Sequence, residues 1–236
     1  MFKKHSTENV LKFYTLDEKS ENLTNPPVPA SSEIPSEWKD THRFIIKDAT
    51  VKVDKDKVNL GLKHCMPYYD AMTSGYIQPT HGDILVEIFN GKPVLTFRSE
   101  LPVVHKLPNE QIKAPQGHYE EHWSFNMWWG LKTPKGYSCL ITQPLNRNLP
   151  FTISSGIMDT DNHTAPGNIS FHIKKGFEGV IPAGTPMFHI FPFKREAWRG
   201  EVDHSLRLEG HYMSRRKLNY LYGYYKKNAW VRKEYR

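Results

Sequence analysis

Short apolar runs, each bounded by turn residues, make up most of this chain. Residues 168–173 alternate polar and apolar side chains, which is the period-two pattern of a strand with one buried face. Asn90-Gly91 separates the runs 84–89 and 94–97 and favours a hairpin, because both residues tolerate positive φ. The remaining runs lie at residues 10–14, 44–46, 49–53, 76–79, 139–141, 151–153, 179–181 and 187–191. This spacing predicts a mainly β domain with many turns.

Two segments flank this β region and differ from it. Residues 25–38 contain four prolines, so the sequence predicts an extended arm, with Trp38 as its anchor. Near the C-terminus, apolar residues recur at the spacing of one helical face, namely Leu218, Leu221, Tyr222 and Tyr225. We therefore expect three parts, which are an N-terminal arm (1–43), a β core (44–200) and a helical tail (201–236).

Aromatic residues make up 13% of the chain and include six tryptophans, so large ring surfaces must be buried in a core or an interface. Residues 123–129 hold three of these tryptophans. The run predicts a core strand or a strand at a subunit contact, rather than a platform on which ligands stack. Two cysteines, Cys65 and Cys139, lie far apart and indicate free thiols in a reducing compartment.

The whole net charge of +7 is found in residues 205–236 of the tail. Residues 205–236 contain nine lysines or arginines and two glutamates, together with half of the twelve tyrosines. Basic and aromatic residues in this mixture either hold a nucleic-acid backbone while rings stack on bases, or anchor the tail to a neighbouring subunit. The amphipathic spacing favours the protein contact. The predicted partner-binding residues are Trp38, Arg215, Arg216, Lys217, Tyr222, Lys226, Lys227 and Trp230.

The phrase Gly156-Ile157-Met158-Asp159-Thr160-Asp161, followed by a strand and a Gly-led turn into a last strand, resembles the dUTPase and dCTP deaminase superfamily. The resemblance implies a β-clip barrel, usually a trimer. It also implies a nucleotide pyrophosphohydrolase or deaminase, in which Asp159 activates a water, Asp161 is the second acid and Mg²⁺ is the cofactor. His189 and Arg195 then contact the phosphates.

The chain departs from that superfamily at positions that read the substrate. Asn162 stands in place of the sugar-stacking tyrosine, and Thr185-Pro186 replaces an Asp-Arg pair. The alternative for Asp159 and Asp161 is a turn in which carboxylates accept hydrogen bonds from backbone N–H groups. These departures favour assembly or binding over catalysis.

Several histidines raise a third alternative, a cupin-like metalloprotein. His81-Gly82-Asp83 with a distant histidine has the facial-triad pattern of iron oxygenases, and His118 and His122 lie beside glutamates. Twelve histidines make such a match easy by chance. Hydrogen-bonded loop histidines are the other interpretation, and we assign no metal.

A broader resemblance covers most of the chain. Phrases such as Cys65-Met66-Pro67, 70–76, 133–138 and 193–196 are similar to a family of tailed-phage and bacterial proteins of unknown function. We therefore expect a phage-type homo-oligomer, with a trimer favoured, that acts in assembly or binding. Its tail would contact other phage proteins or nucleic acid. We expect it in the host cytoplasm or the virion, without a membrane segment or secretion signal.

Overall fold

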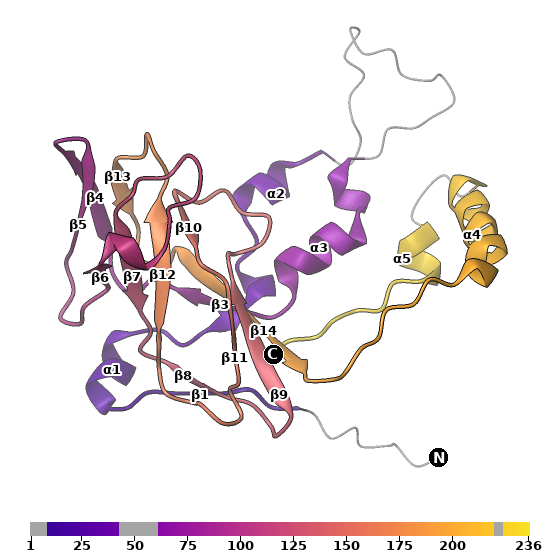
Figure 1. Ribbon diagram of the computed structural model, residues 1–236, viewed down its shortest axis with the longest axis horizontal. Coiled ribbons are helices and arrows are strands. Elements are labelled where there is room, and N and C mark those ends of the chain that lie inside the picture. Colours follow the sequence, from indigo (N-terminus) through magenta and orange to yellow (C-terminus); the bar gives the residue numbers. More distant parts are fainter. Residues whose placement is uncertain (1–8, 43–60, 220–223) are drawn as a thin grey trace, which may run out of the picture.

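The computed structural model describes residues 9–42, 61–219 and 224–236. Fourteen strands, all paired in antiparallel fashion, dominate this part of the chain, so the prediction of a mainly β protein is confirmed. The predicted strands at 44–46 and 49–53 lie outside the described residues. In Figure 1 the strands form a body from which two helices, α4 (Arg207–Asn219) and α5 (Tyr224–Asn228), stand apart.

The largest sheet has five strands in the order β11-β9-β14-β3-β2. Its central strand is β14 (Pro186–Lys194), because the run 187–190 is buried on both faces. β14 pairs with β9 (Tyr137–Thr142) on one side and β3 (Tyr76–Pro79) on the other. The outer strands are β11 (Gly156–Met158) and β2 (Val28–Pro29).

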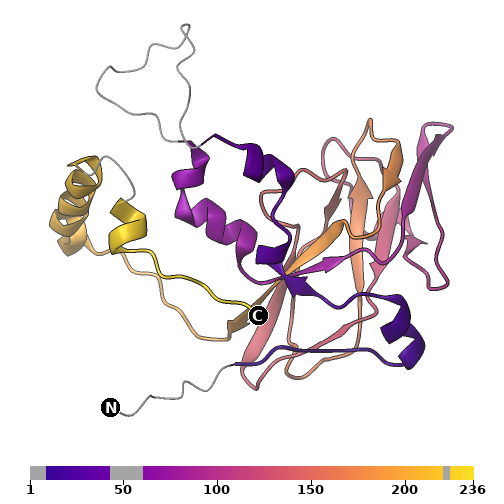
Figure 2. The ribbon, with the colours of Figure 1, turned by 180° about the vertical axis from the view of Figure 1, so that it is seen from behind.

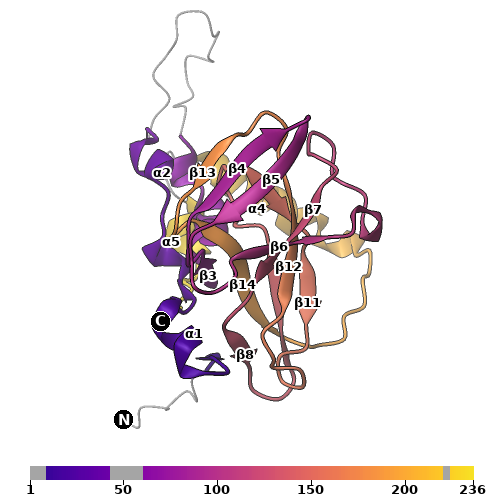
Figure 3. The same ribbon diagram turned by 90° about the vertical axis from the view of Figure 1, so that its left-hand side faces the viewer.

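A second sheet has the order β10-β12-β7-β6, with bounds Phe151–Ile153, Asn168–Ile173, His122–Asn126 and Val104–Leu107. A third contains β13 (Gly179–Ile181) and the hairpin of β4 (Ile84–Phe89) and β5 (Lys92–Phe97), which is in front in Figure 3. Asn90 and Gly91 have φ of 50° and 76°, so the predicted hairpin turn is confirmed. β1 (Lys12–Tyr14) pairs with β8 (Gly130–Lys132).

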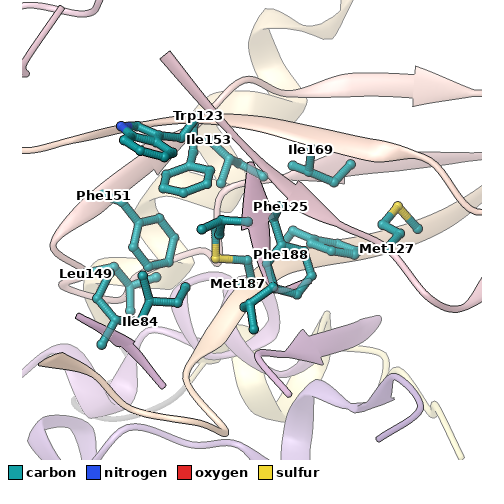
Figure 4. Close-up of a cluster of buried hydrophobic side chains, with 14 of the residues drawn as sticks. Ile84, Trp123, Phe125, Met127, Leu149, Phe151, Ile153, Ile169, Met187 and Phe188 are labelled. Atoms are coloured by element: carbon teal, nitrogen blue, oxygen red, sulfur yellow. The ribbon is translucent and has the colours of Figure 1, made fainter. Parts of the chain in front are cut away.

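The core lies between these sheets (Figure 4). Phe125 from β7 meets Phe188 from β14 edge to face, with ring centroids 6.0 Å apart, and Phe151 meets Phe171 at 5.9 Å. Such pairs add about 0.5–1.5 kcal/mol beyond area burial. Trp123 is 7% exposed and belongs to this core. Residues 123–126 therefore belong to a core strand, as one of the two alternatives predicts, whereas Trp128 lies beyond the strand and is half-buried.

The proline-rich segment 25–38 is not extended throughout. It contains β2, the 3-10 turn η1 (Ala30–Ser32) and the start of helix α2 (Ser36–Asp40). Pro29 and Pro35 stand immediately before the two helical elements, where the missing N–H group has no intrahelical partner to lose. The prolines therefore start short helices here.

Four further helical elements were not predicted. α1 (Glu18–Leu23) begins at Asp17, whose carboxylate accepts a hydrogen bond from the Ser20 backbone N–H at 2.7 Å. α3 (Met66–Thr73) follows the 3-10 turn η2 (Leu62–His64), and a third such turn, η3, covers Asn109–Gln111.

The C-terminal segment leaves the sheets after β14 and returns to them. Residues 195–203 run outward to η4 (His204–Leu206) and α4, and residues 229–236 run back from α5 to the body (Figures 1 and 2). We call residues 196–229 the excursion. Within the described ranges, no helix has both the length and the apolar character that crossing a bilayer requires.

Gly75 allows a close approach of the chain to β14, just before β3 begins. It follows α3 with φ of 76°, and a Cβ there would overlap the backbone carbonyl oxygen of Ile190. Gly91 has the same φ, but a Cβ at that position meets open space. Comparing substitutions at Gly75 and Gly91 therefore distinguishes the cost of positive φ from the cost of steric overlap.

We expect Gly75→Ala to destabilise the protein more than Gly91→Ala. Both substitutions place alanine at positive φ, which costs about 1–2 kcal/mol. Only the change at Gly75 adds overpacking against a backbone atom, at a further cost of about 1–3 kcal/mol. Urea unfolding of both variants measures the difference. Equal losses of stability would show that the contact between Gly75 and the Ile190 carbonyl tolerates a methyl group.

Candidate functional site: an acid–arginine cluster and a basic aromatic cleft

Three of the residues predicted to carry chemistry meet just beyond β14. The guanidinium of Arg195 donates to both carboxylate oxygens of Asp161, at 2.8 and 2.5 Å, and to Oδ1 of Asp159 at 3.2 Å. The two aspartates follow β11, so the contact joins the end of the central strand to the loop after the edge strand. We call Asp159, Asp161 and Arg195 the acid–arginine cluster.

Uncharged donors complete this cluster. The backbone N–H of Gly136 donates to Asp161 at 2.7 Å, and the Ser138 hydroxyl donates to Asp159 at 2.6 Å. The Asp161 side chain is only 3% exposed, and its hydrogen bonds with Arg195 hold the pKa of that carboxyl well below its usual range. A carboxylate stabilised in this way is a weak base. For Asp161 the geometry supports the interpretation in which a carboxylate holds a loop, whereas the Asp159 side chain is 59% exposed and, among the described residues, its carboxylate accepts hydrogen bonds from side chains only.

His189 does not join the cluster. It lies in the middle of β14 with no exposed surface, and its Nε2–H group donates to the carbonyl oxygen of Ser74 at 2.5 Å. Burial lowers the pKa of His189 to about 4, so the ring is neutral at neutral pH. Six residues of extended strand span about 20 Å, which separates this position from Arg195. A phosphate held by Arg195 would therefore not reach His189.

The histidines proposed as metal ligands make hydrogen bonds within the protein. His122 donates from Nδ1 to the Pro108 carbonyl at 3.2 Å, and its Nε2 lies 2.6 Å from the Ser170 hydroxyl. His118 lies 2.9 Å from the Thr152 hydroxyl, and the Asp83 carboxylate accepts from the Ala183 N–H at 2.7 Å. His81 packs against Phe125 and Trp128.

The polar face of β12 is partly covered, although the sequence pattern predicts one solvent-facing side. His172 is 1% exposed and its ring lies parallel to that of His122 at 5.0 Å. Burial and the neighbouring histidines lower the pKa of His172. Among the residues that the structure describes, no three His, Cys, Asp or Glu side chains form a group that could hold a metal ion.

A second candidate site for a ligand lies beside α3. A cleft of about 730 Å³ separates α2 and α3 from the returning C-terminal segment, and we call it the basic cleft. Its walls carry five cationic side chains and four aromatic ones, together with the carboxylates Asp70 and Glu234. The cations are Lys63, Lys226, Arg232, Lys233 and Arg236, and the rings are Trp38, Tyr69, Trp230 and Tyr235.

Asp70 holds one wall of the cleft to the other. Its Oδ2 accepts hydrogen bonds from Nε1 of Trp230 at 2.8 Å and from Nζ of Lys233 at 2.6 Å. Tyr76 adds a contact to the same segment, because its hydroxyl donates to the Arg236 carbonyl and its ring lies edge-on to Tyr235. The cleft is therefore built by contacts between residues about 160 positions apart.

The predicted partner-binding residues divide into several groups. Trp38, Lys226 and Trp230 line the basic cleft, Lys227 is exposed on α5, and Arg215 is exposed on α4. Arg216 and Lys217 belong to α4, and Tyr222 lies outside the described residues. Sequence reasoning missed Asp70, Lys63 and Tyr69, because nothing local marks a helix in the first third of the chain as the partner of the tail.

Comparison with known proteins finds no family model that matches the chain and no curated protein that matches it. The residues themselves therefore carry the functional inference. They offer an ion-paired cluster at the end of the central sheet, a basic cleft, and an excursion between the two.

We expect His189 to make stability pH-dependent. Its pKa in the folded protein, about 4, is below the ordinary value of 6.5, so the unfolded chain binds the proton more readily. The stabilisation is present above pH 6.5 and is lost as the pH falls toward 4. Between pH 7 and pH 5 the loss is roughly 2 kcal/mol. Urea unfolding of the wild type and of His189→Gln at both pH values measures it, and the same pH dependence in both proteins would contradict it.

We expect Asp70→Ala to release the C-terminal segment while the sheets stay intact. Hydrogen bonds to a charged group contribute about 1.5–3 kcal/mol, so amide exchange over residues 230–236 should accelerate roughly tenfold or more. Hydrogen exchange with mass spectrometry reads this out. The matched control is Asp83→Ala, which removes the carboxylate bonded to Ala183 and should leave the tail unchanged. Equal exchange in the two variants would show that Asp70 does not hold the segment.

Proposed function

We propose that this protein is an oligomer-forming assembly or binding protein of the tailed-phage type, and that the excursion contacts a neighbouring copy. The observation that carries the proposal is the exposure of large apolar side chains in the excursion. Trp198 is 88% exposed, Leu208 82% and Val202 81%. Several such side chains in one projecting segment are typical of a surface that another protein covers.

The ends of the excursion are fixed, which supports this role. At its start, Arg195 is bonded to Asp161, and just past its end, Trp230 is bonded to Asp70. A segment held at both ends loses less conformational freedom on binding than a free tail does. The excursion is thus suited to a defined contact.

A second copy of the chain is the partner we favour, in a symmetric oligomer with a trimer as the preferred number. The resemblance to trimeric β-clip proteins supports a β-clip-like core, and the resemblance to tailed-phage proteins supports a role in the virion or in its assembly. Closed symmetric oligomers are also the commonest kind among soluble proteins. The nucleotide-hydrolase alternative has less support, because Arg195 is paired with both candidate carboxylates and the Asp161 side chain is almost completely buried.

Oligomeric state in solution tests the proposal. We expect native mass spectrometry and light scattering at micromolar concentration to find more than one chain per particle. The triple variant Trp198→Ser, Val202→Ser and Leu208→Ser should be a monomer with unchanged circular dichroism, because these side chains are exposed within a single chain.

A matched control separates the excursion from other apolar surfaces. Phe89 is 68% exposed on the β4–β5 hairpin, so Phe89→Ser removes a comparable apolar side chain elsewhere. We expect this variant to remain oligomeric. A monomeric wild type, or dissociation by Phe89→Ser in place of the triple variant, would contradict the assignment.

A further inference from the structure

We propose that the basic cleft binds single-stranded nucleic acid. This site is separate from the exposed apolar residues of the excursion, so it does not depend on the oligomer proposed above. Its volume of about 730 Å³ falls in the range of small-ligand sites, about 300–1,000 Å³, and it would accommodate one or two nucleotides at a time. A longer strand would extend past the cleft over exposed lysines such as Lys227 on α5.

The charge of the cleft favours a polyanion. Its five cationic side chains outnumber its two carboxylates, and both carboxylates already have partners. Asp70 is bonded to Lys233, and Glu234 lies 3.0 Å from Arg236 and 3.8 Å from Arg232. Among the described residues, no carboxylate lies within ion-pair distance of Lys226 or Lys63. Lys63 donates one hydrogen bond to the Lys39 carbonyl at 2.6 Å and keeps two N–H groups for a phosphate. Lys226 stands on the opposite wall, where it can contact a second phosphate.

The aromatic residues favour bases in addition to phosphates. Trp38 lies on one wall, with its ring stacked on Tyr68 at 5.4 Å and tilted to Tyr69 at 6.2 Å. Trp230 lies on the other wall, and its hydrogen bond to Asp70 fixes the indole. Both tryptophans are half-buried, so part of each ring remains accessible. Rings held in this way on either side of a cationic cleft are a means of stacking unpaired bases.

A single strand fits these features better than the other polyanions do. Duplex nucleic acid keeps its bases stacked on one another, so rings inside a cleft could not reach them. An acidic peptide would satisfy the cations but would leave the tryptophans without flat partners. The combination of cations and rings therefore selects a strand whose bases are free.

Fluorescence anisotropy with a labelled oligothymidylate of about 12 nucleotides tests the proposal, since known single-strand sites cover about 4–16 nucleotides. The comparison probe is an abasic deoxyribose-phosphate strand of equal length and charge. We expect the oligothymidylate to bind at least tenfold more tightly. Binding should weaken with salt, and Lys226→Gln/Arg232→Gln should reduce the slope of log K against log salt by about 1.4, or about 0.7 per lost phosphate contact.

Two further variants make the test specific. Trp38→Leu should weaken oligothymidylate binding roughly tenfold and leave the abasic strand unaffected, since stacking is absent there. Lys92→Gln/Lys175→Gln removes the same charge from exposed positions outside the cleft and should change neither affinity. Four results would each overturn the proposal. The protein could bind neither strand, or it could bind the oligothymidylate and the abasic strand equally well. It could bind an acidic peptide of matched charge as tightly as the oligothymidylate, or the double variant in the cleft and the double variant outside it could have equal effects.

Discussion

Two carboxylates with little exposed surface hold the ends of the C-terminal segment, and the surfaces proposed to bind partners depend on them. The side chains of Asp161 and Asp70 are 3% and 13% exposed. A carboxylate removed from water is unfavourable unless it is paired and hydrogen-bonded. Each has one cationic and one neutral donor, Arg195 with the Gly136 N–H for Asp161, and Lys233 with the Trp230 indole for Asp70. The same arrangement thus occurs at both ends.

This double attachment accounts for the unusual position of α4 and α5. The described part of α4 carries many exposed residues, among them Leu208, and has little contact with the sheets. If only one end of its segment were fixed, few contacts would hold this helix in one orientation. With both ends bonded to the body, the helices project without a packed core of their own. The same attachment also builds the basic cleft, because the returning residues 229–236 form one of its walls.

The sequence predicted the strands well and the long-range contacts poorly. Runs such as 84–89 and 151–153 correspond to strands because period-two patterns and turn residues act locally. The helix at 18–23 was missed although Asp17 marks its start, since the segment has no clear apolar periodicity. The order of motifs predicted Asp159 and Asp161 as acids and Arg195 as a phosphate contact, but their pairing depends on the loop after β11 lying beside the end of β14. Asp70 gave no signal, because its partners lie about 160 residues away.

Trp230 and Lys233, which follow the end of the excursion, line the basic cleft, so opening of this segment would alter both surfaces. Opening of this segment separates Trp230 and Lys233 from Asp70, which removes a wall of the cleft and frees one end of the excursion. In the closed state Asp70 holds the segment, and in the open state it does not. A nucleic-acid strand bound between the walls would favour the closed state by the difference between its affinities for the closed and open states. The closed state is also the one that would hold the excursion in place for the proposed contact with a neighbouring copy. Reciprocity then requires that assembly strengthen nucleic-acid binding by the same factor by which nucleic acid strengthens assembly.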